Sequence, residues 1–340
     1  MSRDVFRMIS NVIAHQLNVC KAPWSQIESN GDVDFQSANA ITGKVYSGIN
    51  ALLLPVFRDK YQLKSFDFIS FGQASKLAGI TEEDISQIRS PKSELSYKSK
   101  GHPFIGVSPI GFVVNNSLTY IDKSGKVFNP SDVSKTERLK LSKQWDARTS
   151  PVWSVEQLPI EMRSKLPSHN QGGAELMNNS KINLKSLAQG LIKKEGIKLL
   201  ANKSSGIEFN VDLSVDDDKI SMPNITQFVS DNSFYRTVLY SAVLFIEHKN
   251  QSLGTHQKNE AYSEMVAEFT CALLCQKHGI KGFTSSNLEA VVSNQSEWVA
   301  LMEDNPKVII YVASTAQKLA SYISGAIKYE HSIDEVSPSP

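Results

Sequence analysis

Long apolar segments follow one another through the second half of the chain and restrict the possible folds more than any other sequence feature. Their apolar residues recur with the spacing of a helical face, which predicts helices over residues 234–248, 259–279, 287–302 and 305–327. The first half has short, strand-like segments between helices instead. The sequence therefore predicts an α+β protein, with a mixed α/β N-terminal domain followed by a mostly helical domain.

A polar, turn-rich stretch separates the two halves and serves as the predicted boundary. The chain ends in Ser-Pro-Ser-Pro, which is typical of a disordered tail. The expected units are a first domain over 1–160, a linker region over 161–180, a second domain over 181–330 and a disordered tail over 331–340.

Charge and cysteine content exclude several protein classes. The net charge is +1, which rules out a histone-like polycation. Residues 1–150 hold 19 Lys or Arg against 14 Asp or Glu, so this half is mildly basic and the other mildly acidic. Three cysteines cannot form a disulfide framework and fit a reducing compartment. There is neither a signal-peptide pattern nor an apolar run long enough for a membrane span, so we expect a cytoplasmic protein without a membrane partner.

Several familiar catalytic motifs are absent from the sequence. It contains no phosphate-binding loop ending in Lys-Ser/Thr, no dinucleotide fingerprint and no nucleophile elbow. Cys271 and Cys275 lie four residues apart on a predicted helix, a spacing that two metal ligands can use. No second cysteine pair accompanies them, so small buried thiols are the better interpretation.

Basic and aromatic residues alternate in the first half, a combination that binds single-stranded nucleic acid. Rings stack on bases while lysines meet phosphates, and each stacked base contributes about 1–3 kcal/mol. Core packing alone also explains most of these aromatic residues, so composition leaves DNA binding open. The residues in question are Lys21, Trp24, Lys44, Tyr46, Phe71, Lys76, Tyr97, Lys98 and Lys100.

A resemblance to a known family gives this pattern a meaning. Four landmarks carry it in order: Pro23-Trp24 with Asn39-x-x-Thr-Gly-Lys-x-Tyr-x-Gly-Ile-Asn50, then Ser70-Phe71-x-Gln73-Ala74, Lys98-x-Lys100-Gly101 and Val152-Trp-Ser-Val-Glu-Gln157. Together they resemble the N-terminal domain of ArdC-type antirestriction proteins and TraC-type plasmid primases. The resemblance implies single-stranded DNA binding. The implied contact residues are Lys21, Trp24, Lys44, Tyr46, Asn50, Phe71, Lys98 and Lys100.

The second half continues the resemblance to roughly residue 327. The segments 222–235, 261–269, 274–280 and 313–323 resemble successive parts of the ArdC-type zincin-like metallopeptidase domain. That family places His-Glu-x-x-His on the helix after Phe-Tyr, and here the corresponding run is Tyr240-Ser-Ala-Val-Leu244. Tyr240 and Leu244 thus replace both histidine ligands, and Ser241 replaces the glutamate base. Glu264 stands at the third ligand position.

These replacements remove what a zinc peptidase requires. Two imidazoles one helical turn apart must face one ion, and a glutamate must take a proton from the metal-bound water. We therefore expect no metal or other cofactor and a catalytically inactive domain. The helix is expected to pack as core, with Tyr240 partly filling the former metal cavity.

The leading hypothesis is a single-stranded DNA-binding protein of a plasmid or phage in the bacterial cytoplasm. It would protect incoming DNA or inhibit a host restriction or other defence protein. One alternative is a divergent zinc metallopeptidase with a relocated site at His248, His256 and Glu264. Another is a pure protein-interaction inhibitor of a host nuclease that binds no DNA.

Overall fold

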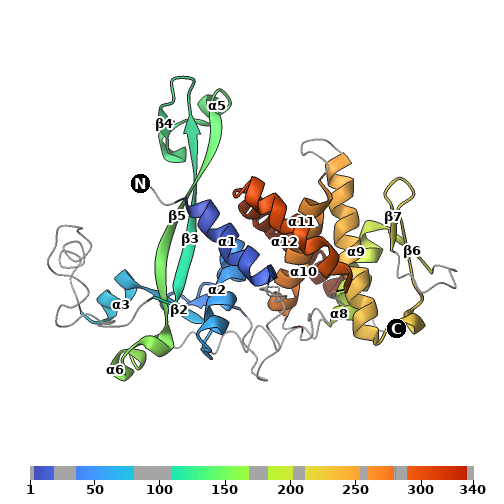
Figure 1. The fold of residues 1–340 in the computed structure, drawn as a ribbon, viewed down its shortest axis with the longest axis horizontal. Coiled ribbons are helices and arrows are strands. Elements are labelled where there is room, and N and C mark those ends of the chain that lie inside the picture. Colours follow the sequence, from blue (N-terminus) through green and yellow to red (C-terminus); the bar gives the residue numbers. More distant parts are fainter. Residues whose placement is uncertain are drawn as a thin grey trace.

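The computed structural model describes residues 4–18, 36–79, 109–167, 183–201, 211–252, 259–278, 280 and 289–334. These residues have the predicted α+β architecture. Figure 1 shows a sheet-containing part and a helical part, with α1 between them. Several residues predicted to contact DNA or metal lie outside the described residues: Lys21, Trp24, Lys98, Lys100 and His256.

A five-stranded mixed sheet organises the first half. Its strands run in the order β1-β2-β5-β3-β4, with β1 parallel to β2 and the other neighbours antiparallel. The elements of this half are α1 (Val5–Asn18), β1 (Ala38–Asn39), α2 (Ile49–Lys60), β2 (Asp67–Ser70), α3 (Phe71–Leu77), β3 (Gly111–Ile121), β4 (Val127–Phe128), α5 (Lys135–Arg138), β5 (Ser142–Ser154) and α6 (Ile160–Arg163).

The strands β3 and β5 form a long ribbon that projects from the body of the molecule (Figure 1). Gly111 pairs with Val152 and Ile121 pairs with Ser142, so the ladder is continuous from one end to the other. Polar residues interrupt the apolar pattern in the middle of β3 without ending the strand. The ladder continues through them because pairing with β5 uses backbone hydrogen bonds, which do not depend on the polarity of the side chains.

Helices dominate the second half, as predicted. A small sheet in the order β6-β8-β7 accompanies them. The elements are α8 (Leu184–Glu195), β6 (Lys198–Ala201), β7 (Asp212–Ser214), β8 (Lys219–Met222), α9 (Asp231–Ser252), α10 (Glu260–His278), α11 (Glu289–Asp304) and α12 (Val308–Asp334). Because α12 continues to Asp334, the first four residues of the segment predicted as a disordered tail are helical, and 335–340 lie outside the described part.

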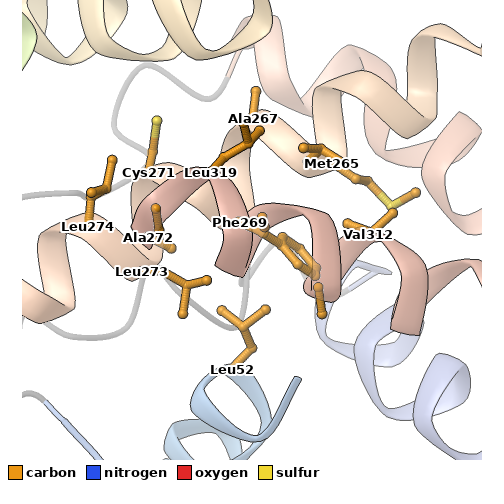
Figure 2. Close-up of a cluster of buried hydrophobic side chains, with 14 of the residues drawn as sticks. Leu52, Met265, Ala267, Phe269, Cys271, Ala272, Leu273, Leu274, Val312 and Leu319 are labelled. Atoms are coloured by element: carbon orange, nitrogen blue, oxygen red, sulfur yellow. The ribbon is translucent and has the colours of Figure 1, made fainter. Parts of the chain in front are cut away.

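Helices from both halves share one hydrophobic core. Ile9 of α1 and Leu52 of α2 are fully buried in the same cluster as Phe269 of α10 and Ile309 of α12. Figure 2 shows Leu52 next to Leu273 of α10 within this cluster. The N-terminal helices thus pack against the helical half, and the division into domains at 160–180 stays a prediction.

Candidate nucleic-acid interface and degenerate metal site

The turn after β1 is held by an amide pair at its base. The Nδ2–H of Asn39 donates to Oε1 of Gln73 at 3.1 Å, and Nε2–H of Gln73 donates back to Oδ1 of Asn39 at 3.0 Å. Oδ1 of Asn39 also accepts the backbone N–H groups of Ile41 and Thr42, both at 3.1 Å. One side chain therefore fixes the turn 40–44 against α3, which begins with a capping box from Ser70 to Gln73.

This turn presents Lys44 to solvent beside Tyr46. Lys44 and Val45 are exposed, whereas the Tyr46 ring is half-buried against the core. Burial raises the pKa of the Tyr46 hydroxyl, and its contact with Asn39 partly opposes that rise. The hydroxyl therefore stays protonated near neutral pH and adds no negative charge beside the lysine. An exposed cation and an adjacent ring are the groups that a nucleotide strand uses.

Two other predicted DNA contacts have structural roles. Asn50 joins α2 to β3 by two hydrogen bonds. Its Nδ2–H donates to the Val114 carbonyl at 2.8 Å, and its Oδ1 accepts the Val114 N–H at 2.7 Å. Phe71 is buried and packs its ring against Trp153, with centroids 6.2 Å apart. Little of either side chain is available to a base, so Lys44 and Tyr46 are the stronger candidates among the described residues.

In the helical half, α9 is packed as core over residues 240–245, which include the run predicted to replace the metal-binding motif. Ser241 and Leu244 are buried, along with Ala242, Val243 and Phe245. The Tyr240 side chain is partly buried against the same core. Burial and the neighbouring carboxylates of Glu268 and Glu264 raise its pKa well above the ordinary value. The phenol therefore stays neutral beside those carboxylates.

A tryptophan donates a hydrogen bond to Glu264, the residue predicted to stand at the third ligand position. The Nε1–H of Trp298 in α11 donates to Oε2 of Glu264 at 3.0 Å, and both side chains are buried. Sequence reasoning missed Trp298, which lies 34 residues from Glu264 in no recognisable motif. An indole N–H can only donate, so it stabilises the carboxylate without recreating a metal site.

No hydrogen bond or ion pair between His248 and Glu264 of the alternative, relocated site is found in the described part of the chain, and His248 instead pairs with Glu260, outside that set. Nε2 of His248 lies 3.5 Å from Oε2 of Glu260, across the gap between α9 and α10. His248 is thus a half-buried helical residue with an acidic partner. Within the described ranges, no group of three His, Cys, Asp or Glu side chains has the arrangement of a metal site. His256 lies outside those ranges.

The two halves match different family models. Residues 3–90 match the model described as the N-terminal domain of anti-restriction factor ArdC, and residues 188–315 match the one described as zincin-like metallopeptidase. The fold is also similar to crystal structures of the antirestriction ArdC protein from R388 plasmid. The metal-free structure has a TM-score of 0.60 at 17% identity, over 96% of this chain and 98% of that one. The chain is ArdC-like.

The Mn(II)-bound crystal structure of the R388 protein has a TM-score of 0.58 at 15% identity, over 95% of this chain and 98% of that one. No curated protein matches the sequence. In this ArdC-like chain the residues do not fit a zincin metal. Tyr240, Leu244 and Ser241 supply no imidazole or carboxylate, and Glu264 accepts a hydrogen bond from Trp298. None of the helices in the described part of the chain has the length and apolarity that a membrane span requires.

Proposed function

We propose that this ArdC-like chain is an antirestriction protein that binds single-stranded DNA through its N-terminal domain and carries an inactive zincin-like domain. It would act in the bacterial cytoplasm for a plasmid or phage, protecting incoming DNA or inhibiting a host defence enzyme. The antirestriction role follows from the similarity to ArdC in both halves of the chain.

The observation that carries the DNA-binding proposal is the fixed turn that presents Lys44 beside Tyr46. A turn already ordered by Asn39 loses little conformational freedom when a strand binds, which favours affinity. The Lys44 ammonium meets a phosphate, and the exposed part of the Tyr46 ring offers a surface for a base. These contacts do not depend on base identity, so the proposed binding tolerates different sequences.

The proposal of an inactive peptidase domain rests on the chemistry at α9 and α10. A hydrolytic zinc site needs three protein ligands and an open position for water. By the resemblance, the two histidine ligands are replaced here by a phenol, Tyr240, and an apolar side chain, Leu244, and the glutamate base is replaced by Ser241. Glu264 alone remains of the three ligands. Apolar packing around Leu244 and Phe245 stabilises this helix instead.

Fluorescence anisotropy with labelled oligonucleotides tests DNA binding. We expect tighter binding to single strands than to duplex, and an affinity that falls as salt increases because lysine–phosphate contacts release counterions. Lys44→Gln should reduce the salt slope by about 0.7, because the variant neutralises one phosphate fewer. The exposed Lys165→Gln is the matched control. Equal affinity for single strands and duplex, or no salt dependence, contradicts the proposal.

Elemental analysis of protein purified without chelators tests the inactive domain. A working zinc site retains its metal during purification. Because we propose that this domain has no such site, we expect less than roughly a tenth of an equivalent of zinc. A full equivalent, together with peptide cleavage that a chelator abolishes, would instead support the relocated site at His248. Pull-down from nuclease-treated host lysate separates direct binding to a defence protein from association through DNA.

A further inference from the structure

One face of α12 carries exposed rings and lysines outside the N-terminal domain. Tyr311 and Tyr322 are 43% and 49% exposed, and Lys318 between them is exposed as well. Lys318 and Tyr322 follow Tyr311 by seven and eleven residues. At about 100° per residue, both side chains project within about 20° of the direction of Tyr311 around the helix axis. The two rings are about 16 Å apart along the axis, room for at most about five stacked nucleotides. We call this surface, Tyr311, Lys318 and Tyr322, the α12 stripe.

The charge of α12 itself suits a polyanion. Residues 305–329 contain no Asp or Glu, so the α12 segment that carries the stripe has no carboxylate of its own. Lys307 is exposed at the start of the helix, with its ammonium 5.3 Å from the ring centre of Phe6 in α1. This basic surface lies in the second half of the chain, whose overall charge is acidic. The net charge summed over that half therefore gives no sign of it.

The ring of Tyr322 is held in place by α8. Its hydroxyl donates to Oε1 of Glu195 at 2.8 Å, and the Lys194 ammonium lies 3.2 Å from the ring centre. The hydrogen bond orients the ring, and the Lys194 ammonium covers one face of it, so a base would stack on the opposite face. A pre-oriented aromatic side chain loses little entropy when a base stacks on it.

A contact with the segment after the proposed DNA-binding turn lies on α12 next to the stripe in sequence, about 100° around the helix from Lys318. The backbone N–H of Gly48, which follows that turn, donates to Oε1 of Gln317 at 2.8 Å. Gln317 directly precedes Lys318 on α12. Packing of α2 against α10 and α12 keeps this junction fixed, and Nε2–H of Gln276 also donates to the Ala51 carbonyl at 3.3 Å.

We propose that the α12 stripe continues the path of single-stranded DNA from Lys44 and Tyr46 onto the zincin-like domain. Tyr311 and Tyr322 would stack bases, and Lys318 would contact the phosphates between them. This inference rests on the proposed DNA-binding function. It gives the former peptidase domain a part in holding DNA, and it makes the binding site longer than the N-terminal domain alone provides.

Anisotropy with oligonucleotides of two lengths tests the proposal on the full chain. Strands of roughly 6 nucleotides fill one subsite, whereas strands of roughly 20 span both, given typical sizes of single-strand sites. Tyr311→Ala combined with Tyr322→Ala should weaken binding of the long strand about ten-fold or more, since each stacked base supplies a substantial fraction of the affinity. Lys318→Gln should lower the salt slope for the long strand by about 0.7.

Tyr61→Ala is the matched control, because Tyr61 is 48% exposed and also has a lysine, Lys60, near its ring. It lies at the far end of α2, about 20 Å along the helix from Gly48. Unchanged thermal unfolding of each variant shows that the fold is intact. If the stripe variants bind the long strand as tightly as the unaltered protein does, the extended path is wrong while the proposed function stands. If the unaltered protein binds no single-stranded DNA, both fail.

Discussion

The indole Nε1–H of Trp298 donates a 3.0 Å hydrogen bond to Oε2 of Glu264, the residue predicted from the resemblance to stand at a metal-ligand position. Both side chains are buried, and α11 and α10 supply one each. A buried carboxylate needs donors to replace the water it has lost, and the indole supplies one. The Glu264 carboxylate is therefore compatible with a packed core.

This relationship predicts a measurable coupling between the two side chains. Trp298→Phe removes a donor from a buried carboxylate and should lower the free energy of unfolding by about 1–3 kcal/mol in addition to packing effects. In a Glu264→Gln background the loss should be smaller, because a neutral amide tolerates a missing donor better than a carboxylate does. Urea unfolding of the four proteins in this double-mutant cycle gives the coupling free energy, and additive effects would contradict the prediction.

Restoring the family motif should restore metal binding. The triple change Tyr240→His, Ser241→Glu and Leu244→His places two imidazoles one turn apart, with Glu264 as third ligand. We expect uptake of about one equivalent of zinc by the triple variant, measured by titration and elemental analysis. Adding Glu264→Gln should weaken that uptake. Failure of the triple variant to bind zinc while folded would show that the backbone here no longer matches the metal geometry.

The asparagine at the base of the N-terminal turn should control DNA affinity. Asn39→Ala removes the acceptor for the Ile41 and Thr42 N–H groups, so the turn must be ordered anew at each binding event. We expect affinity for single strands to fall about ten-fold, close to 1.4 kcal/mol. Asn115→Ala is the control, since this exposed residue of the β3–β5 ribbon has a comparable side-chain bond, to Ser150. Anisotropy measures both, and equal losses would contradict the prediction.

Alkaline pH should destabilise the helical half. Burial raises the pKa of Cys275 from 9.0 to about 12. Between those pH values the unfolded chain releases the proton while the folded chain keeps it, so stability is full below pH 9 and falls as pH rises. The slope is up to about 1.4 kcal/mol per pH unit from this thiol. Denaturant unfolding from pH 8 to 11 should show a smaller slope in Cys275→Ala, and an identical slope would contradict this origin.

Close packing at the start of β3 should make Gly111 intolerant of a side chain. A Cβ at this position would overlap the ring of Phe57 in α2. Gly111→Ala should lower the free energy of unfolding by about 1–3 kcal/mol, and Phe57→Leu should reduce that loss. Gly325→Ala is the control, because nothing lies within 4 Å of its added Cβ. In the helix α12 this change should stabilise by about 0.5–1 kcal/mol, as urea unfolding would show.

The sequence determined the fold class and most helices, because apolar periodicity is local and long helices display it clearly. It also predicted the loss of the metal ligands, since a motif at fixed spacing is readable without coordinates. Strand limits were less accessible. The sequence predicts short, strand-like segments in the first half, yet Gly111–Ile121 is one long strand, because pairing with β5 carries the ladder through its polar residues. The end of α8 also depends on tertiary structure. The helix ends at Glu195, where Gly196 adopts a left-handed conformation, and residues 198–201 then pair with β8.

Only the tertiary structure decided which candidate residues share a surface. Asn50 and Phe71 belong to motifs that predict DNA contacts. In the structure Asn50 is hydrogen-bonded to the Val114 backbone, and Phe71 packs against Trp153. Trp298 has no motif and reaches Glu264 only because α11 packs against α10. The contact of Gly48 with Gln317 joins residues 269 positions apart. Contacts of that separation depend on how helices pack against one another, which local spacing along the chain does not encode.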